Sequence, residues 1–193
     1  MIIGCDLDDV LADFIGAFTS MAYCKFGRPV PETKPADWEW SNFELSKEEI
    51  ASLWRDIQTT ENFWESIAVE RGVDRELVQS LDDMHTLYFP TARAHTSGRP
   101  VSKQSAKWLN QNFNIQFPTV FVASEKGPMA RVLKYDCFID DRPKNCIDIK
   151  ASLPNCRVYL KNSSHNVSYS APFNITRIDS FNEFAKIVLK GEL

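Results

Sequence analysis

The sequence of 193 residues predicts an α/β protein built on one parallel sheet. Short apolar runs that end in polar residues alternate with segments of helical periodicity, as in sheets whose parallel strands are joined by crossover helices. Hydrophobic residues make up 44% of the chain and charged residues 25%, which is typical of a globular domain with one sizeable core. No repeat or low-complexity tract interrupts this pattern.

Six short apolar runs are the predicted strands of the sheet. They cover residues 1–5, 87–89, 120–122, 137–139, 157–160 and, at an edge of the sheet, 175–178. Helical periodicity fills the intervals, and Phe14, Phe18 and Met21 place the first helix at residues 11–25. Further helices are expected at residues 101–113, 128–133 and 145–152 and, after a capping box formed by Ser180 and Glu183, near the C-terminus.

The stretch from about residue 26 to residue 69 breaks this alternation and holds an uneven share of the aromatic residues. Within it, Ser46 and Glu49 form a capping box that predicts a helix over residues 46–59. A second helix, at residues 74–84, leads back to the sheet. We therefore expect a small helical cap over the carboxyl ends of the strands, where open α/β sheets bind ligands.

Composition and the N-terminal sequence exclude several classes of protein. The net charge of −4 argues against broad nucleic-acid binding through a basic surface. No apolar run approaches the roughly 20 residues of a membrane-spanning helix, and the N-terminus lacks the basic and apolar regions of a signal peptide. The five cysteines include no C-x-x-C pair, so we expect free and mostly buried thiols. These features together predict a soluble cytoplasmic protein.

Polar side chains follow four of the predicted strands, at the point where each strand ends. They are the Asp6-Leu7-Asp8-Asp9 segment, Thr91, Lys126 and the Asp140-Asp141 pair. Carboxylates this close repel one another strongly in a low-dielectric site unless a divalent cation lies among them. Because oxygen-only ligands suit Mg²⁺, the sequence predicts a magnesium site.

This set of groups fits phosphoryl transfer through a covalent aspartyl phosphate. A carboxylate can attack phosphorus when a metal ion offsets its repulsion from the phosphate. A hydroxyl and an ammonium group are suited to hold the transferring oxygens, and a second carboxylate two residues along the chain can protonate the leaving oxygen. Each element alone is weak evidence, but the ordered set at four strand ends is strong.

The order of these motifs resembles that of the haloacid dehalogenase superfamily of phosphatases, and most of all the 5′(3′)-deoxyribonucleotidases and their bacterial and phage relatives. The motifs are D-L-D-D-V-L-A-D-F, then T-A-R, then a lysine about thirteen residues before I-D-D-R-P-K-N, and the match runs from residue 2 to about residue 160. The resemblance implies a three-layer, Rossmann-like core at residues 1–15 and 85–193, with the helical cap inserted at residues 16–84. It also implies a Mg²⁺-dependent phosphomonoesterase of (deoxy)ribonucleoside monophosphates.

The resemblance carries roles onto matching residues only. Asp6 would be the nucleophile that becomes phosphorylated, and Asp8 the general acid and then the general base. Thr91 and Lys126 would bind the transferring phosphoryl group. The implied Mg²⁺ site comprises Asp6, the main-chain carbonyl of Asp8, Asp140 and, as a support for the ion or for a bound water, Asp141.

Aromatic residues indicate how a nucleotide would be held. Phe14, Phe63 and Trp64 fall where these nucleotidases place aromatic side chains against the base and the sugar, and stacking contributes about 1–3 kcal/mol per base. Arg93 and Arg99 are candidate ligands of the phosphate, and we include Arg93 in the predicted substrate-binding set. The expected partner is therefore a small phosphorylated molecule.

The sequence departs from the family pattern in three places. Asp9 replaces a common glycine, and Ala92 replaces a serine that contacts phosphate in the deoxyribonucleotidases. The loop at residues 94–100 is longer and more polar than expected. These departures leave the reaction class unchanged and bear on the identity of the substrate.

Some assignments have alternatives. Thr96 or Ser97 can replace Thr91 as the phosphate-binding hydroxyl, since Thr-Ser-Gly also suits a phosphate-binding turn. We prefer Thr91 because it directly follows the apolar run 87–89, at a strand end. His165 lies in a polar stretch, so we expect it to be solvated and assign it no catalytic role.

Other functions remain as alternatives. A phospho-signalling receiver domain needs a phosphorylatable aspartate after a central strand, and the nearest candidate, Asp56, lies on the predicted helix at 46–59. A non-catalytic module that binds phosphorylated ligands would be expected to have lost the nucleophile or a metal carboxylate. The enzyme could also act on another small phosphorylated metabolite or on the end of a nucleic acid. The sequence leaves a homodimer open.

Overall fold

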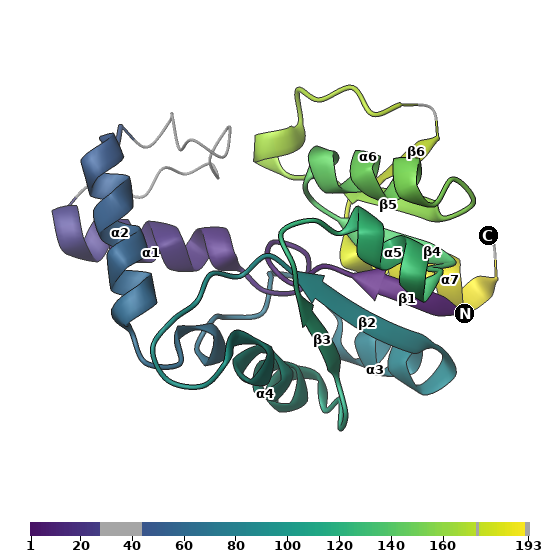
Figure 1. Ribbon diagram of the computed structural model, residues 1–193, viewed down its shortest axis with the longest axis horizontal. Coiled ribbons are helices and arrows are strands. Elements are labelled where there is room, and N and C mark those ends of the chain that lie inside the picture. Colours follow the sequence, from purple (N-terminus) through teal and green to yellow (C-terminus); the bar gives the residue numbers. More distant parts are fainter. Residues whose placement is uncertain (28–43, 173, 192–193) are drawn as a thin grey trace.

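Six parallel strands form one sheet in the order β3-β2-β1-β4-β5-β6 in a computed structural model that describes residues 1–27, 44–172 and 174–191 (Figure 1). The strands are β1 Ile2–Cys5, β2 Thr86–Thr91, β3 Thr119–Val122, β4 Cys137–Asp140, β5 Arg157–Lys161 and β6 Ile175–Ile178. The described helices are α1 Phe14–Phe26, α2 Lys47–Thr59, α3 Arg75–Met84, α4 Val101–Phe113, α5 Gly127–Leu133, α6 Pro143–Ser152 and α7 Phe181–Lys190, with short 3-10 helices η2 Phe63–Glu65 and η3 Ser164–Asn166. The predicted α/β class is confirmed.

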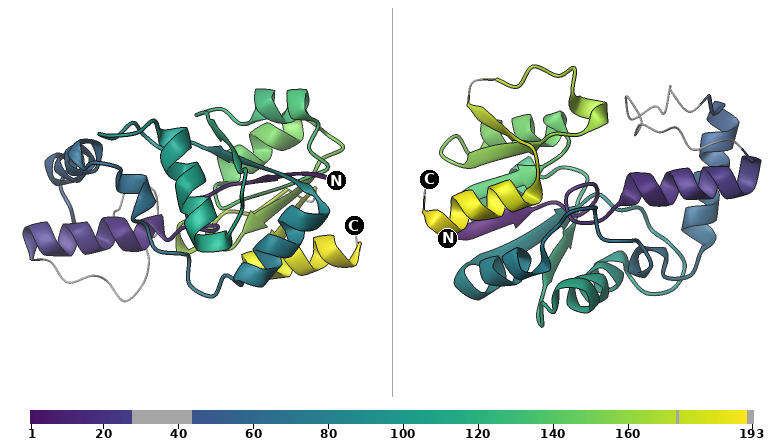
Figure 2. Two further views of the ribbon diagram at one scale, coloured as in Figure 1. Left: turned by 90° about the horizontal axis from the view of Figure 1, so that it is seen from below. Right: turned by 180° about the vertical axis from the view of Figure 1, so that it is seen from behind.

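The sheet lies between two layers of helices, which makes the three-layer core that was predicted. Side chains alternate along each strand, so Ile139 of β4 packs in one cluster with α3, α4 and α7, whereas its neighbour Phe138 packs with α5 and α6. Figure 2 shows α3 and α7 on the side of the sheet opposite to α5 and α6. Cys5 is buried in the first cluster, as expected of most of the thiols.

The first helix begins three residues later than its periodicity predicted, because residues 7–12 form a tight loop. The main-chain N–H groups of Leu11 and Ala12 both donate to the carbonyl of Leu7, each at 2.8 Å. Asp9 lies in this loop with φ of 57°, a left-handed conformation that explains why glycine is common there and which aspartate tolerates better than most residues. Its Oδ1 accepts a hydrogen bond from the N–H of Ile15, which stabilises the start of α1.

Both predicted capping boxes mark real helix starts, but only one is complete. Ser46 and Glu49 exchange the two expected hydrogen bonds at the start of α2. At α7, Ser180 Oγ accepts from the N–H of Glu183 as expected. The Glu183 carboxylate, however, accepts from the N–H of Asp179 at 2.7 Å instead of from Ser180.

The segment between β1 and β2 leaves and re-enters the core through two adjacent stretches. The N–H of Asp13 donates to the carbonyl of Ala68 at 2.9 Å, and the N–H of Glu70 donates to that of Leu11 at 2.8 Å. The helices α1 and α2 lie beyond the end of the sheet to which the strands point (Figure 1), whereas α3 packs against α7 and β2. The cap at 16–84 stays a prediction, and its residues 28–43 lie outside the described part of the chain.

Among the helices that the structure describes, none combines the length and apolar character needed to cross a membrane.

We predict that Gly4→Ala destabilises the fold, because Gly4 lies at the centre of the sheet beneath two stacked rings. An added Cβ would lie 2.6 Å from a ring carbon of Phe138 and 2.7 Å from one of Tyr135, and both rings are buried. We expect the free energy of unfolding in urea to fall by about 1–3 kcal/mol. Val132→Ala, at an exposed position of α5, should change it by less than about 0.5 kcal/mol. Equal stability of Gly4→Ala and the wild-type protein would show that the rings can move aside.

Candidate active site

Three of the four predicted polar features meet at the carboxyl end of the sheet, and the fourth, Thr91, is the last residue of the neighbouring strand β2. Asp6 follows β1, Lys126 follows β3, and Asp140 is the last residue of β4. Lys126 Nζ lies 2.5 Å from Asp6 Oδ1 and 2.7 Å from Asp140 Oδ2. All three side chains are buried. Parallel pairing therefore brings together residues as far apart in the sequence as Asp6 and Asp140, as the pattern of strand ends predicted.

Burial and repulsion among the carboxylates set the charge states of this cluster. Burial raises the pKa of Asp6 well above its usual range, Lys126 offsets part of this rise, and Asp140 adds to it. Burial also raises the pKa of Asp140, for which Lys126 is again the main opposing group. Burial alone would lower the pKa of Lys126, but the two carboxylates outweigh it and keep the ammonium protonated. The site therefore has more carboxylates than its one lysine can neutralise.

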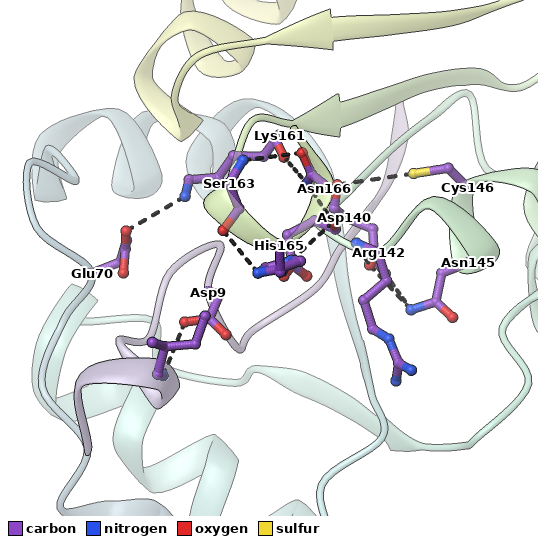
Figure 3. Close-up of polar contacts among 12 residues, drawn as sticks. Asp9, Glu70, Asp140, Arg142, Asn145, Cys146, Lys161, Ser163, His165 and Asn166 are labelled. Atoms are coloured by element: carbon purple, nitrogen blue, oxygen red, sulfur yellow. Dashed lines mark hydrogen bonds and ion pairs between the residues drawn. The ribbon is translucent and has the colours of Figure 1, made fainter. Parts of the chain in front are cut away.

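Asp140 is oriented by the start of α6. Its Oδ1 accepts a hydrogen bond from the main-chain N–H of Arg142 at 2.8 Å, and Asn145 Nδ2 lies 3.0 Å from its Oδ2 (Figure 3). Together with Lys126 these donors occupy both oxygens of the carboxylate. Asn145 was not singled out in the sequence, although its place in I-D-D-R-P-K-N is a signal that points to it.

Asp141 is held from the other side by the loop around η3. His165 Nε2 lies 2.8 Å from Asp141 Oδ2, and Asn166 Nδ2 donates to the main-chain carbonyl of Asp141 at 2.7 Å. The other ring nitrogen of His165 lies 2.9 Å from Ser163 Oγ. The expectation of a solvated histidine was therefore wrong. His165 follows β5, which pairs with β4, so its loop lies beside Asp141 at the end of β4.

The carboxylates form a group that fits a divalent cation. Asp6, Asp140 and Asp141 each offer one oxygen, and these oxygens lie within 4.8 Å of one another. Asp141 Oδ1 is buried and accepts no hydrogen bond from the residues that the structure describes. Mg²⁺ prefers oxygen ligands, and this group offers only oxygens. The carboxylate of Asp8 is not in this group, and its main-chain carbonyl stays a predicted ligand.

A cavity of about 640 Å³ opens above these residues. Its polar floor includes Asp6, Asp8, Lys126 and Asp141, with Arg93 and Arg142 beside them. Its apolar part comes mainly from α1, α2 and η2. The apolar lining residues are Phe14, Leu45, Ile50, Trp54 and Trp64. A volume of this size is in the range of small-molecule sites.

The aromatic wall differs from the predicted set by one residue. The ring of Phe14 lies 5.7 Å from both Trp54 and Trp64, measured between ring centroids. Phe63 does not line the cavity and instead packs edge-on against Trp64, at 5.2 Å and 81°. Trp54 was absent from the predicted set, although it lies on the apolar face of the helix predicted over 46–59. Helical periodicity predicts the apolar face of this helix but not which residues of that face line the cavity.

The candidate phosphate ligands have varied surroundings. Thr91 is buried at the end of β2, and its Oγ1 lies 3.4 Å from the main-chain N–H of Arg93. Its alternative, Thr96, is buried and accepts a hydrogen bond from Gln104 Nε2 at 2.9 Å. Arg99 pairs with Glu65 at 2.7 Å, at the surface. Arg93 lines the cavity, but its guanidinium forms an ion pair with Asp8 at 2.8 Å.

Comparisons with known proteins agree with this geometry. The family model described as "5′ nucleotidase, deoxy (Pyrimidine), cytosolic type C protein" matches residues 1–193. A curated protein of Chlorobaculum tepidum, named "Putative 5′(3′)-deoxyribonucleotidase", is 26% identical over 154 residues, which cover 78% of this chain and 74% of that protein. A haloacid dehalogenase-like hydrolase of Streptococcus pneumoniae has a similar fold, with a TM-score of 0.59 at 13% identity over 100% of this chain and 98% of that one.

The raised pKa of Asp6 predicts that its ionisation destabilises the metal-free fold. The unfolded chain releases this proton near pH 3.8, whereas the folded chain holds it to a higher pH. Unfolding therefore releases a proton between these two values, and stability falls as the pH rises through that window. In EDTA we expect Asp6→Asn to be more stable than the wild-type protein at pH 7, with a gap that narrows as the pH approaches 4.

Urea unfolding at a series of pH values between 4 and 8 measures this gap. The exposed variant Asp83→Asn serves as the control and should follow the wild-type curve closely. A variant Asp6→Asn that is less stable than the wild-type protein at every pH would contradict the prediction, because the carboxylate would then stabilise the fold through Lys126.

Proposed function

This chain belongs to the 5′ nucleotidase, deoxy (pyrimidine), cytosolic type C family of hydrolases. We propose that it is a Mg²⁺-dependent phosphatase of pyrimidine deoxyribonucleoside monophosphates and that the reaction passes through an aspartyl phosphate. One observation carries the proposal. A buried acidic group bridged by Lys126 forms the floor of a cavity whose opposite wall is aromatic. Such a cavity offers a charged end for a phosphate and an apolar end for a base.

In the first half of the proposed reaction, Asp6 is the nucleophile. A carboxylate oxygen of Asp6 forms a bond to phosphorus while the bond from phosphorus to the ester oxygen breaks. The electron pair of that bond stays on the leaving oxygen, which takes a proton from the Asp8 carboxyl group. Asp8 lines the same cavity two residues further along the chain, which supports this role.

In the second half, Asp8 has become the base. Its carboxylate takes a proton from a water molecule as that water attacks the phosphorus of phosphorylated Asp6. Inorganic phosphate leaves, and both aspartates return to their starting states. Lys126, which already forms an ion pair with Asp6, holds the negative oxygens of the transferring group. We assign the same role to the Thr91 hydroxyl because its position matches the family motif.

The acidic group would hold the metal ion. Asp6, Asp140 and Asp141 would supply carboxylate oxygens, and Asp8 its main-chain carbonyl. When bound, Mg²⁺ offsets the repulsion between the Asp6 carboxylate and the incoming phosphate. Asn145 and His165 hold Asp140 and Asp141 in place for that purpose.

The aromatic wall supports a nucleotide over other phosphorylated metabolites. The half-buried Trp54 and the buried Trp64 both line the cavity, and aromatic rings stack on bases of any sequence. The end of a nucleic acid is a weaker candidate, because the chain carries a net charge of −4 and a long polyanion needs a basic surface.

Phosphate release tests the reaction directly. We expect turnover of deoxyribonucleoside monophosphates with Mg²⁺ and none in EDTA. Asp6→Asn should lower kcat by more than about 10³-fold, since the nucleophile is lost. Asp83→Asn should keep the wild-type rate. Release from a generic aryl phosphate alone would retain the phosphatase and discard the nucleotide, and no release from any phosphoester would contradict the proposal.

Trp54 tests the base-binding wall. We expect Trp54→Ala to raise KM for a pyrimidine deoxynucleotide by about 5- to 150-fold, because stacking contributes about 1–3 kcal/mol per base. Trp54→Phe keeps a ring and should recover most of this loss. Phe63→Ala, which lies behind Trp64, should raise KM less. A sugar phosphate without a base is the control substrate, and an equal rise in its KM would mean that Trp54 does not recognise the base.

A further inference from the structure

Arg93 places a buried guanidinium directly on Asp8. Its side chain is fully buried, whereas that of Asp8 is 18% exposed. Arg93 Nε lies 3.0 Å from Asp8 Oδ1 and 3.1 Å from Oδ2, and Nη2 lies 2.8 Å from Oδ1. This is a forked contact of the kind that fixes both the position and the plane of a carboxylate.

The guanidinium is itself held from three sides. Nη1 donates to Ser105 Oγ of α4 at 3.0 Å. The indole of Trp64 lies 4.8 Å from the guanidinium carbon, and that of Trp108 lies 5.6 Å from it. Both indoles are fixed in turn, since Trp64 Nε1 donates to the carbonyl of Ala94 at 2.9 Å and Trp108 Nε1 to that of Ile67 at 2.6 Å. Arg93 is therefore part of a rigid assembly.

We propose that Arg93 is a positioning residue for proton transfer by Asp8, rather than a ligand of the phosphate. Two donors of Arg93 engage Asp8 Oδ1, and only one longer contact reaches Oδ2. The fork thus fixes the plane of the carboxylate and leaves Oδ2 with the greater capacity to exchange a proton at the cavity. Nε, Nη1 and Nη2 of Arg93 each already donate to Asp8 or Ser105, and the side chain is fully buried, which leaves it little to offer a substrate.

The inference rests on the proposed function, because it assigns Arg93 to the step in which the leaving oxygen takes a proton from Asp8. In that step Asp8 becomes a carboxylate, which the guanidinium is already placed to pair with. General acid catalysis depends on correct placement of the acid. It matters most for a leaving group that is a strong base.

The choice of leaving group separates this role from a merely structural one. A nucleoside monophosphate releases an alkoxide that must be protonated, whereas p-nitrophenyl phosphate releases a stabilised phenolate that needs no proton. In the first turnover, we expect Arg93→Gln and the reference variant Asp8→Asn to slow nucleoside release from a pyrimidine deoxynucleotide by about 10²-fold or more. Release of p-nitrophenolate in the first turnover should slow by less than about tenfold in both variants, with KM near the wild-type value, because Asp8 acts as a base only in the later hydrolysis of phosphorylated Asp6, which both substrates share.

Three further variants keep the test decisive. Arg93→Lys retains the charge but lacks the planar fork, so it should recover only part of kcat. Ser105→Ala removes one anchor of the guanidinium and should show the same leaving-group selectivity to a smaller extent, even if Arg93→Gln does not fold. Arg131→Gln, an exposed arginine of α5, should leave both reactions unchanged.

Each outcome has a distinct meaning. Equal losses on both substrates in Arg93→Gln and Ser105→Ala would overturn the inference, since the role would be structural. A raised KM with kcat unchanged would overturn it in favour of a phosphate ligand. No turnover of either substrate by the wild-type protein would instead overturn the proposed function and the inference with it.

Discussion

The rest of the site depends on one constraint, which is that three carboxylates lie buried around a single ammonium group. Asp6, Asp140 and Asp141 come from two neighbouring strands, and Lys126 reaches two of them. Removing a carboxylate from water is costly, so the surrounding structure supplies donors to each one. Lys126 donates to Asp6, Arg142 and Asn145 donate to Asp140, and His165 lies against Asp141 Oδ2. The excess of negative charge that remains is what a cation would neutralise.

The cavity combines this charged floor with an apolar wall, and the two parts come from different regions of the chain. The floor belongs to the sheet, whereas the wall belongs to α1, α2 and η2. Arg93 joins them, because its guanidinium bonds Asp8 on one side and contacts Trp64 on the other. A shift of the Trp64 ring would therefore move Arg93 and, through Arg93, the carboxylate of Asp8. Contacts between side chains thus connect the two ends of the cavity.

Local sequence signals were reliable where a single interaction determines the outcome. The capping box at Ser46 and Glu49 formed as predicted, and the six apolar runs became the six strands. The errors arose where a neighbouring main-chain group competes. The Glu183 carboxylate accepts from the N–H of Asp179, and α1 begins late because the carbonyl of Leu7 accepts from the N–H groups of Leu11 and Ala12. Helical periodicity cannot detect either contact.

The sequence by itself determined the fold class, the strands and the acidic, hydroxyl and lysine residues at their ends, because parallel strands bring their carboxyl ends to one edge whatever the details of packing. Only the tertiary structure decided how those groups are paired. His165 lies against Asp141, Arg93 is turned to Asp8, and Trp54 replaces Phe63 in the cavity wall. Each of these outcomes depends on where a side chain meets a segment remote in sequence. Neither composition nor periodicity carries that information.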